Sequence, residues 1–196
     1  MRDAPNKDPL QAVVDWHREA QTVMARDPDA MTLATATRDG APSARIVLFK
    51  GVDAGEILFV TNYSSRKGQQ IDENPAVALV FYWPELMRQI RVEGIARRSP
   101  VDESEAYFRS RPRESQLGAW ASAQSTPIAS RAELEQRFAA AAERFGDRDV
   151  ERPPYWGMYR VRPQRIELWL GGAHRLHDRF QYDRNDESWS VTRLSP

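Results

Sequence analysis

Two neighbouring cations, Arg66 and Lys67, stand at the start of a helix predicted over residues 64–74, directly after Ser64 and Ser65. The first turn of a helix has free backbone N–H groups and the positive end of the helix dipole, so cations are mildly unfavourable there. Backbone donors, serine hydroxyls and cations together are typical of an anion site, and phosphate is the common occupant. A solvated charged turn is the alternative, and we favour the anion site.

A second basic group lies in the segment Arg109–Ser115, which reads RSRPRES. Tyr107, Arg111 and Ser115 follow one another at a spacing of four, so a phenol, a guanidinium and a hydroxyl recur regularly. These side chains are donors suited to a second phosphate. An exposed arginine-rich corner would have the same sequence, and the pattern alone does not separate the two.

Lysine is rare in this chain, because 28 basic residues include only Lys7, Lys50 and Lys67. An ammonium is a compact point charge and a guanidinium is a planar fork, so a lysine retained against this bias can have a particular chemical task. Lys50 ends an apolar strand that Arg45 begins. Cations at strand ends are more often solvated than functional, and chance explains Lys7 in the polar N-terminal segment.

The third group of candidates lies between Trp169 and Arg179. If this segment is extended, Arg175, His177 and Arg179 share one face, because side chains alternate along a strand. Three cationic or protonatable groups in line repel one another unless an anionic group meets them. Asp178 would point to the opposite face and the chain has no cysteine, so we expect no metal site.

The composition excludes several classes of protein. The 196 residues have a formal net charge of zero, which gives no basic field for nucleic acid. The absence of cysteine excludes disulfides, thiolate nucleophiles and zinc–thiolate sites. The polar N-terminus lacks the apolar segment of a secretory signal, and no apolar run could span a membrane. We therefore expect a cytoplasmic protein.

Helices and strands can be placed from periodicity and capping signals. Helices are predicted over 10–26, 64–74, 100–110 (Ser99 as N-cap, Pro100 first) and 130–146 (opened by Ser130 and Glu133). Strands are predicted over 31–37, 44–50, 56–61, 76–83, 89–97, 157–161, 165–170, 178–182 and 189–194.

This order of elements predicts a mainly β fold with peripheral helices. Strands and helices do not alternate as in a parallel sheet, and no GxGxxG or Walker-type loop is present. An antiparallel sheet with this many strands usually closes to protect its edges, so we predict an antiparallel β-barrel. One domain is expected over residues 27–196, preceded by an N-terminal helix or arm over residues 1–26. Two phosphate-like sites on such a barrel suit a flavin nucleotide with a phosphorylated substrate.

The same stretches closely resemble the pyridoxine (pyridoxamine) 5′-phosphate oxidase family. The resemblance runs from about Asp27 to Pro196, and its most specific parts are RPRESQLGAW at residues 111–120 and RLHDRF at residues 175–180. It implies an FMN-binding split β-barrel, and a homodimer with FMN at the subunit interface. Since split barrels host several functions, these motifs and not the fold carry the functional expectation.

The resemblance also implies the roles of individual residues. FMN would be bound by Arg45, Ile46, Val47, Leu48, Phe49, Lys50, Val60, Thr61, Arg66, Lys67, Gln89, Gln124, Ser125, Trp169 and Arg179. The substrate phosphate would be bound by Lys50, Tyr107, Arg111 and Ser115. Arg175 and His177 would lie over the substrate ring as the catalytic pair, with His177 acting as a base or only binding.

The implied reaction oxidises pyridoxine or pyridoxamine 5′-phosphate to pyridoxal 5′-phosphate. Hydride would pass from the substrate C4′ to flavin N5, and dioxygen would reoxidise the flavin and leave as hydrogen peroxide. Two departures from the family pattern are visible: the N-terminal arm is shorter, and Val60 stands where tyrosine is frequent. Two alternatives stay open, namely a related flavin oxidase of another ring, such as a phenazine precursor, and a flavin- or haem-binding barrel without turnover. An oligonucleotide-binding barrel is improbable at zero net charge.

Overall fold

The computed structural model describes residues 4, 7–186 and 188–196, so part of the predicted arm over residues 1–26 lies outside the described residues. The strands are β1 (Ala30–Ala36), β2 (Pro42–Asp53), β3 (Glu56–Asn62), β4 (Ala76–Trp83), β5 (Arg88–Arg98), β6 (Trp156–Leu170), β7 (Asp178–Asn185) and β8 (Ser188–Leu194). The α-helices are α1 (Pro9–Val23), α2 (Arg66–Glu73), α3 (Val101–Ser110), α4 (Arg113–Ala121) and α5 (Arg131–Phe145), and Pro84–Leu86 and Ala173–Arg175 form short 3-10 turns.

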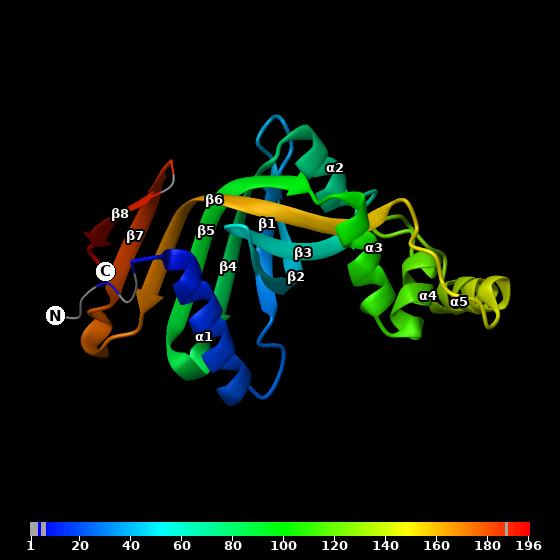
Figure 1. The fold of residues 1–196 in the computed structure, drawn as a ribbon, viewed down its shortest axis with the longest axis horizontal. Helices are drawn as coiled ribbons and strands as arrows, with labels where there is room; N and C mark the ends of the chain where they lie inside the picture. The colour runs from blue at the N-terminus through cyan, green and yellow to red at the C-terminus, as the bar shows by residue number, and fades with distance from the viewer. Residues whose placement is uncertain (1–3, 5–6, 187) are drawn as a thin grey trace.

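The predicted antiparallel barrel is confirmed. Neighbouring strands pair in the order β3-β2-β1-β4-β5-β6-β7-β8, and β3 also pairs with β6, which closes a barrel of six strands (Figure 1). The first half of β6 closes the barrel against β3, and its second half leaves the barrel to pair with β7.

The expectation of separate strands over 157–161 and 165–170 was wrong, because β6 is continuous. Proline lacks the N–H that a strand donates, which favoured a break near Pro163. The structure accommodates Pro163 with a register shift at which Gln164 of β6 is left without a partner: Glu93 pairs with Arg165, and the next residue of β5, Gly94, pairs with Pro163. A Cβ on Gly94 would lie 2.4 Å from the Arg162 carbonyl oxygen, so the shift requires glycine.

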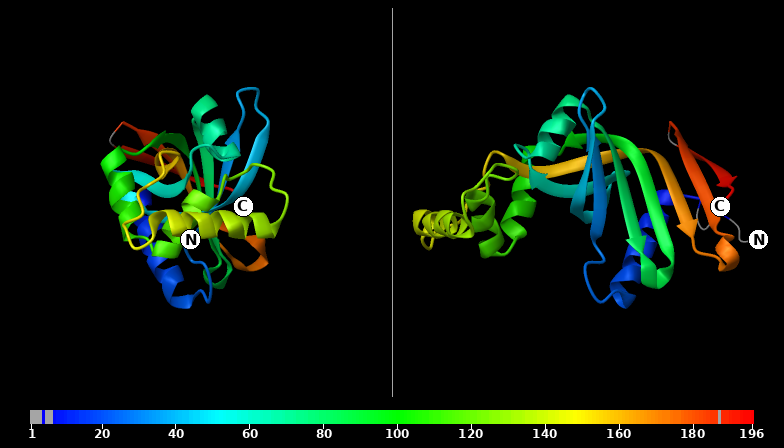
Figure 2. Two further views of the ribbon diagram at one scale, coloured as in Figure 1. Left: turned by 90° about the vertical axis from the view of Figure 1, so that its right-hand side faces the viewer. Right: turned by 180° about the vertical axis from the view of Figure 1, so that it is seen from behind.

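The main core fills the barrel and continues onto α1. Leu33, Phe59 and Phe81 are fully buried inside the barrel, and Val13 and Trp16 of α1 belong to the same cluster. Burial of a large apolar side chain contributes about 1.5–3 kcal/mol, so the contacts of Val13 and Trp16 hold α1 against the barrel. In Figures 1 and 2, α1 lies beside β4 and β5.

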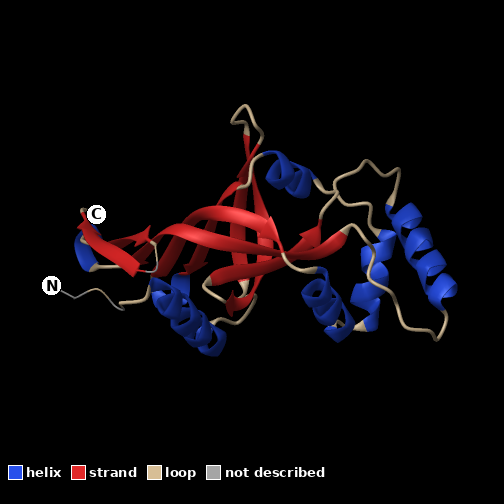
Figure 3. Ribbon diagram, turned by 45° about the horizontal axis from the view of Figure 1, so that its top comes forward, coloured by secondary structure: helices blue, strands red, loops and turns tan. Residues whose placement is uncertain are grey.

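A second, smaller core holds α3, α4 and α5 together at one end of the molecule (Figure 3). It contains Phe108, Leu117, Phe145 and Trp156. No helix was predicted between residues 110 and 130, and this was wrong, because α4 begins at Arg113. Pro112 stops α3 and fixes the backbone from which α4 starts.

The capping predictions had mixed outcomes. Ser65 caps α2 by accepting the N–H of Gly68, and Ser130 caps α5 by accepting the N–H of Glu133. The prediction for α3 was wrong, since Pro100 is its N-cap and the Ser99 hydroxyl is buried without a hydrogen-bond partner among the described residues. Helix α1 ends at Val23 rather than at residue 26.

Candidate active site

A pocket of about 450 Å³ lies between β2, β3, the first turn of α2 and α4. The sequence-predicted residues that line it are Ile46, Val47, Leu48, Val60, Thr61, Lys67, Arg111, Ser115 and Gln124. Its other lining residues are Asn62, Gly118, Ala119, Ser122 and Trp156, so no carboxylate of the described residues lines it. Arg45 and Arg66 do not line the pocket, but they lie near Lys67, because the charge of Arg45 lowers the pKa of Lys67 and the charge of Arg66 lowers that of Arg45. We refer to the lining residues together with these two arginines as the cationic pocket.

The ammonium of Lys67 is buried in this pocket among neutral partners. Its Nζ donates to Gln124 Oε1 at 2.7 Å and to the hydroxyls of Thr61 and Ser65 at 3.2 Å each. Burial, and secondly the charge of Arg45, lower the pKa of Lys67 to about 8. A buried ammonium that donates only to neutral acceptors lacks a counter-charge, which a bound anion would supply.

Arg45 is the second cation of the pocket. Its Nη1 donates to Leu33 O at 3.1 Å and to Thr35 Oγ1 at 2.7 Å. Burial, and secondly the charge of Arg66, lower the pKa of Arg45. In the described part of the chain, neither Arg45 nor Lys67 forms an ion pair. With Arg66 they make three neighbouring cations, and no carboxylate of the described residues lines the pocket beside them.

Arg111 forms a second cationic position, at the junction of α3 and α4. Its guanidinium lies 4.5 Å from the centre of the Trp156 ring, and Tyr107 stacks on the same ring at 6.3 Å and 10°. Burial lowers the pKa of Arg111, and its Nη1 has no hydrogen-bond partner among the described residues. Ser115 follows on the first turn of α4, and Arg111 and Ser115 both line the pocket. Tyr107 does not line it and lies next to Arg111 on the Trp156 ring.

Three of the residues predicted to bind FMN do not line the pocket. The ring of Phe49 is in the core, 5.4 Å from that of Phe81, so only its backbone could face a ligand. Lys50 does not line the pocket, and its Nζ lies 3.9 Å from Asp29 Oδ2. Ser125 lies in the loop after α4 in a left-handed conformation, with φ of 70°.

The remaining predicted residues gather on β5, β6 and β7. Gln89 is opposite Trp169, and Trp169 is opposite Arg179, so the three form one row across the sheet, which we call the β5–β7 row. The Arg179 guanidinium donates to Glu167 through Nε at 2.8 Å and through Nη2 at 3.1 Å. Glu167 also accepts from Arg91 at 3.2 Å, so this row carries its own counter-charge.

His177 joins the β5–β7 row, but the expected extended segment from Arg175 to Arg179 was wrong. Arg175 ends the 3-10 turn with φ of 62°, and β7 begins only at Asp178. The His177 ring lies 4.6 Å from that of Trp169, and its Nδ1 accepts the N–H of Gly172 at 3.1 Å. Arg175 is exposed at the turn.

The cationic pocket and the β5–β7 row belong to different regions of one protomer. Trp156 begins β6 and Trp169 is thirteen residues further along it, which is roughly 40 Å of extended strand. In the right-hand view of Figure 2, α3–α5 and β7–β8 lie at opposite ends of the barrel. A single protomer therefore divides the predicted site into two parts.

Comparison with known families decides the relationship. A model described as pyridoxamine 5′-phosphate oxidase matches residues 17–145, and one described as the pyridoxine 5′-phosphate oxidase C-terminal dimerisation region matches residues 156–196. The chain belongs to the pyridoxamine 5′-phosphate oxidase family.

Curated members of this oxidase family match over nearly the whole chain. The pyridoxine/pyridoxamine 5′-phosphate oxidase of Rubrobacter xylanophilus is 55% identical, with 99% of this chain and 89% of that protein covered. The enzyme of the same name from Salinibacter ruber is 48% identical, with 100% and 92% covered. The protein is thus an enzyme of this family. Separately, none of the helices in the described residues has the length and apolar character of a membrane span.

Solved structures agree on the family fold. PhzG from Burkholderia lata 383, in complex with tetrahydrophenazine-1-carboxylic acid, superposes with a TM-score of 0.92 at 31% identity, covering 99% of this chain and 95% of that one. A pyridoxamine 5′-phosphate oxidase-related, FMN-binding protein from Nostoc punctiforme has a TM-score of 0.75 at 19% identity, with 96% and 98% covered, and shows the fold alone.

Sequence reasoning missed two residues that hold the predicted ligand-binding side chains in place. Trp156 supports both Tyr107 and Arg111, and Glu167 neutralises Arg179. Both lie on β6, far in sequence from the residues that they contact. A buried tryptophan and a glutamate in a strand have no local pattern that distinguishes them from core and surface residues.

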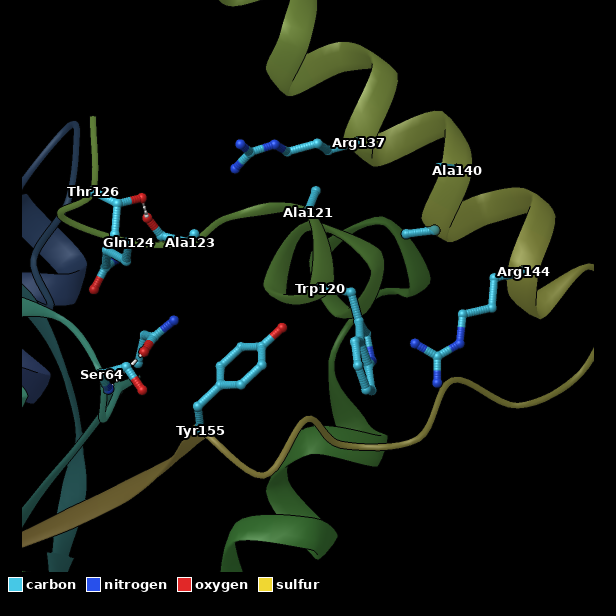
Figure 4. Close-up of a pocket in the computed structure, with 12 residues that line it drawn as sticks. Ser64, Trp120, Ala121, Ala123, Gln124, Thr126, Arg137, Ala140, Arg144 and Tyr155 are labelled. Atoms are coloured by element: carbon cyan, nitrogen blue, oxygen red, sulfur yellow. Dashed lines mark hydrogen bonds between the residues drawn. The ribbon is translucent and has the colours of Figure 1, made fainter. Parts of the chain in front are cut away.

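A further pocket of about 460 Å³ adjoins the cationic pocket and shares Asn62 and Gln124 with it. Figure 4 shows Arg137 and Arg144 of α5 on one side of it and Tyr155 on the other. Arg137 donates to Glu133 at 2.6 Å, and Arg144 stacks on Trp120 at 4.4 Å. Arg137 is thus paired with a carboxylate, whereas Lys67 and Arg45 of the cationic pocket contact only neutral acceptors.

Proposed function

We propose that this protein oxidises pyridoxine 5′-phosphate or pyridoxamine 5′-phosphate to pyridoxal 5′-phosphate with FMN and dioxygen. The single observation that carries the proposal is the cationic pocket. Lys67, Arg45 and Arg111 are each buried enough to lower their pKa, and no carboxylate lines the pocket. Cations in this state favour phosphate ligands, and the two positions suit one phosphate on the cofactor and one on the substrate.

The residues of the pocket fit an FMN phosphate. Arg45, Arg66 and Lys67 would supply charge, while the first turn of α2 would supply backbone N–H groups. The exposed side chains of Ile46 and Leu48 offer an apolar surface next to the phosphate position. FMN, when bound, supplies a two-electron acceptor that dioxygen can reoxidise.

The substrate phosphate would be bound by Tyr107, Arg111 and Ser115. Trp156 fixes the first two by stacking, so their donors are held in place before substrate arrives. Lys50 could join them only through a change of partner from Asp29. The phosphate end of the substrate would therefore be fixed by groups from α3 and α4.

His177 and Arg175 would act on the substrate ring. His177 Nδ1 accepts a backbone N–H, so in the neutral ring the proton is on Nε2. Nε2 is then a donor to the substrate, which favours binding over general-base catalysis for His177. Arg175 is exposed on the neighbouring turn and would orient the ring by its positive charge.

A homodimer would bring the two parts of the site together, with FMN between the subunits. The family model for residues 156–196 describes a dimerisation region. The outer face of the barrel carries the exposed apolar side chains of Ile46, Leu48, Tyr82 and Ile95, which a partner could cover. The cationic pocket of one protomer would then face the β5–β7 row of the other. We infer a cytoplasmic enzyme, in line with its bacterial relatives.

The test is aerobic turnover of pyridoxine 5′-phosphate by the purified protein with added FMN, followed by the formation of pyridoxal 5′-phosphate. We expect turnover that requires FMN. Bound FMN without turnover of either vitamer would refute the proposed reaction and leave the cofactor in place.

The likeness to PhzG supports one other candidate, oxidation of a tricyclic phenazine precursor that has no phosphate. Arg111→Ala separates the two, since it should raise KM for a phosphorylated substrate and leave a phenazine substrate unaffected. Curated vitamin B6 oxidases at 48–55% identity favour the phosphorylated substrate.

A further inference from the structure

Arg45 is held by three acceptors within its own protomer. Nη1 donates to Leu33 O and Thr35 Oγ1, and Nη2 donates to Ser43 Oγ. A guanidinium has five N–H groups and no acceptor. Three are used here, so two N–H groups remain to donate elsewhere.

These contacts of Arg45 determine where the hydroxyl protons of Thr35 and Ser43 point. Because Arg45 can only donate, the hydroxyls of Thr35 and Ser43 must accept from it, and their own protons must point elsewhere. Both hydroxyls lie 2.6 Å from Gln70 Oε1. This distance is typical of O–H···O bonds and shorter than usual N–H···O bonds, which places the carbonyl oxygen of Gln70 toward the two hydroxyls.

Gln70 is 3% exposed, on the buried face of α2, and its Nε2 has no hydrogen-bond partner in the described part of the chain. An unpartnered buried amide nitrogen is unfavourable, so an apolar residue would suit this position better if packing were the only requirement. The useful atom is therefore Oε1, which accepts from both hydroxyls at once.

We propose that Gln70 is a positioning residue for the cofactor phosphate: it orients the Thr35 and Ser43 hydroxyls, which in turn fix Arg45. This inference rests on the proposed binding of FMN. Gln70 is buried and does not line the pocket, so its effect on a ligand would be indirect. Its effect passes through Arg45 alone and applies only to ligands that carry a phosphate.

The experiment compares FMN with riboflavin, which has the same ring system and no phosphate. Gln70→Met removes the acceptor at similar volume, and Gln69→Met is the matched control, because Gln69 is the exposed neighbour on the same helix. We expect Gln70→Met to raise the Kd for FMN about tenfold, with riboflavin binding unchanged and Gln69→Met without effect. Equal weakening of FMN and riboflavin, or no weakening of either, would overturn the inference.

A double-mutant cycle with Arg45→Met tests the route of the effect. If Gln70 acts through Arg45, Gln70→Met should weaken FMN binding no further once Arg45 is replaced. Additive losses would contradict the positioning role. If Gln70→Met does not fold, Thr35→Val gives the same comparison with an isosteric change. Wild-type protein that fails to bind FMN would refute the proposed function itself, and this outcome is distinct from all of those above.

Discussion

The cationic pocket and the β5–β7 row both contain arginines, but they differ in how the positive charge is balanced. In the row, Arg179 and Arg91 share the buried carboxylate of Glu167, and this carboxylate raises the pKa of Arg179. In the pocket, Arg45 and Lys67 donate only to neutral acceptors, and their pKa values are lowered.

This difference indicates which ligand each region can bind. A cation paired within the protein is already stabilised and gains little from an added anion. An unpaired buried cation gains a full counter-charge when phosphate binds. The pocket is thus suited to phosphate groups, while the row offers aromatic and amide groups to an uncharged ring. The pocket is also less stable without its ligand, because its charges are desolvated.

The strongest test of this comparison removes the charge from the pocket. Arg66→Ala with Lys67→Ala should weaken FMN binding by roughly 100- to 10,000-fold, since two charge-assisted contacts of about 1.5–3 kcal/mol each are lost. Titration by quenching of flavin fluorescence measures this, with riboflavin as the ligand control. Unchanged FMN affinity would show that the phosphate is bound elsewhere.

Next in size is an effect on turnover without an effect on FMN. Arg175→Ala should keep FMN bound and lower kcat/KM on the order of 100-fold, because a charged group that orients the reacting ring is lost. Arg162→Ala, an exposed arginine of β6, serves as the control in steady-state assays. Turnover close to that of wild type would discard the assignment of Arg175.

The pH dependence of FMN binding gives a smaller effect. In the ligand-free protein, the pKa of Lys67 is lowered to about 8, and a bound phosphate would raise it. Binding above pH 8 then requires proton uptake, so FMN affinity should be nearly constant around pH 7 and fall by up to about tenfold per pH unit above pH 8. Below about pH 6 it should also fall, because the phosphate itself takes up a proton. Lys67→Arg should move this fall in affinity to higher pH. If the variant and the wild type have the same pH profile, the fall is not caused by the titration of Lys67.

The smallest expected effect concerns the stability of the ligand-free protein. A base whose pKa is lowered on folding destabilises the fold at pH values below that pKa, and the penalty disappears as the pH rises from about 8 toward 10.5. Lys67→Met should therefore stabilise the ligand-free protein at pH 7 by about 1–2 kcal/mol, or roughly 3–6 °C in Tm. Calorimetry without FMN measures it, and a lower Tm would mean that the hydrogen bonds of Lys67 outweigh its desolvation.

The sequence predicted most of the fold, because the signals involved are local. The Ser65 and Ser130 caps and the alternation along the strands place the helices and strands that surround the site. Local signals failed where distant contacts decide. The α4 helix begins directly after a proline in an arginine-rich segment, and packing of Leu117 in the small core stabilises it. The turn at Arg175 depends on Gly172, where a Cβ would lie 2.0 Å from the Leu176 carbonyl oxygen.

By itself, the sequence determined that thiol chemistry is absent and, through RPRESQLGAW and RLHDRF, the family, and it predicted which side chains bind phosphate. Only the tertiary structure decided how charge is balanced around these groups. Arg179 and Arg45 look alike in the sequence, yet one lies beside Glu167 and the other beside Thr35, Ser43 and Gln70. The reason is that desolvation and pairing depend on neighbours brought together by folding, and sequence spacing does not record them.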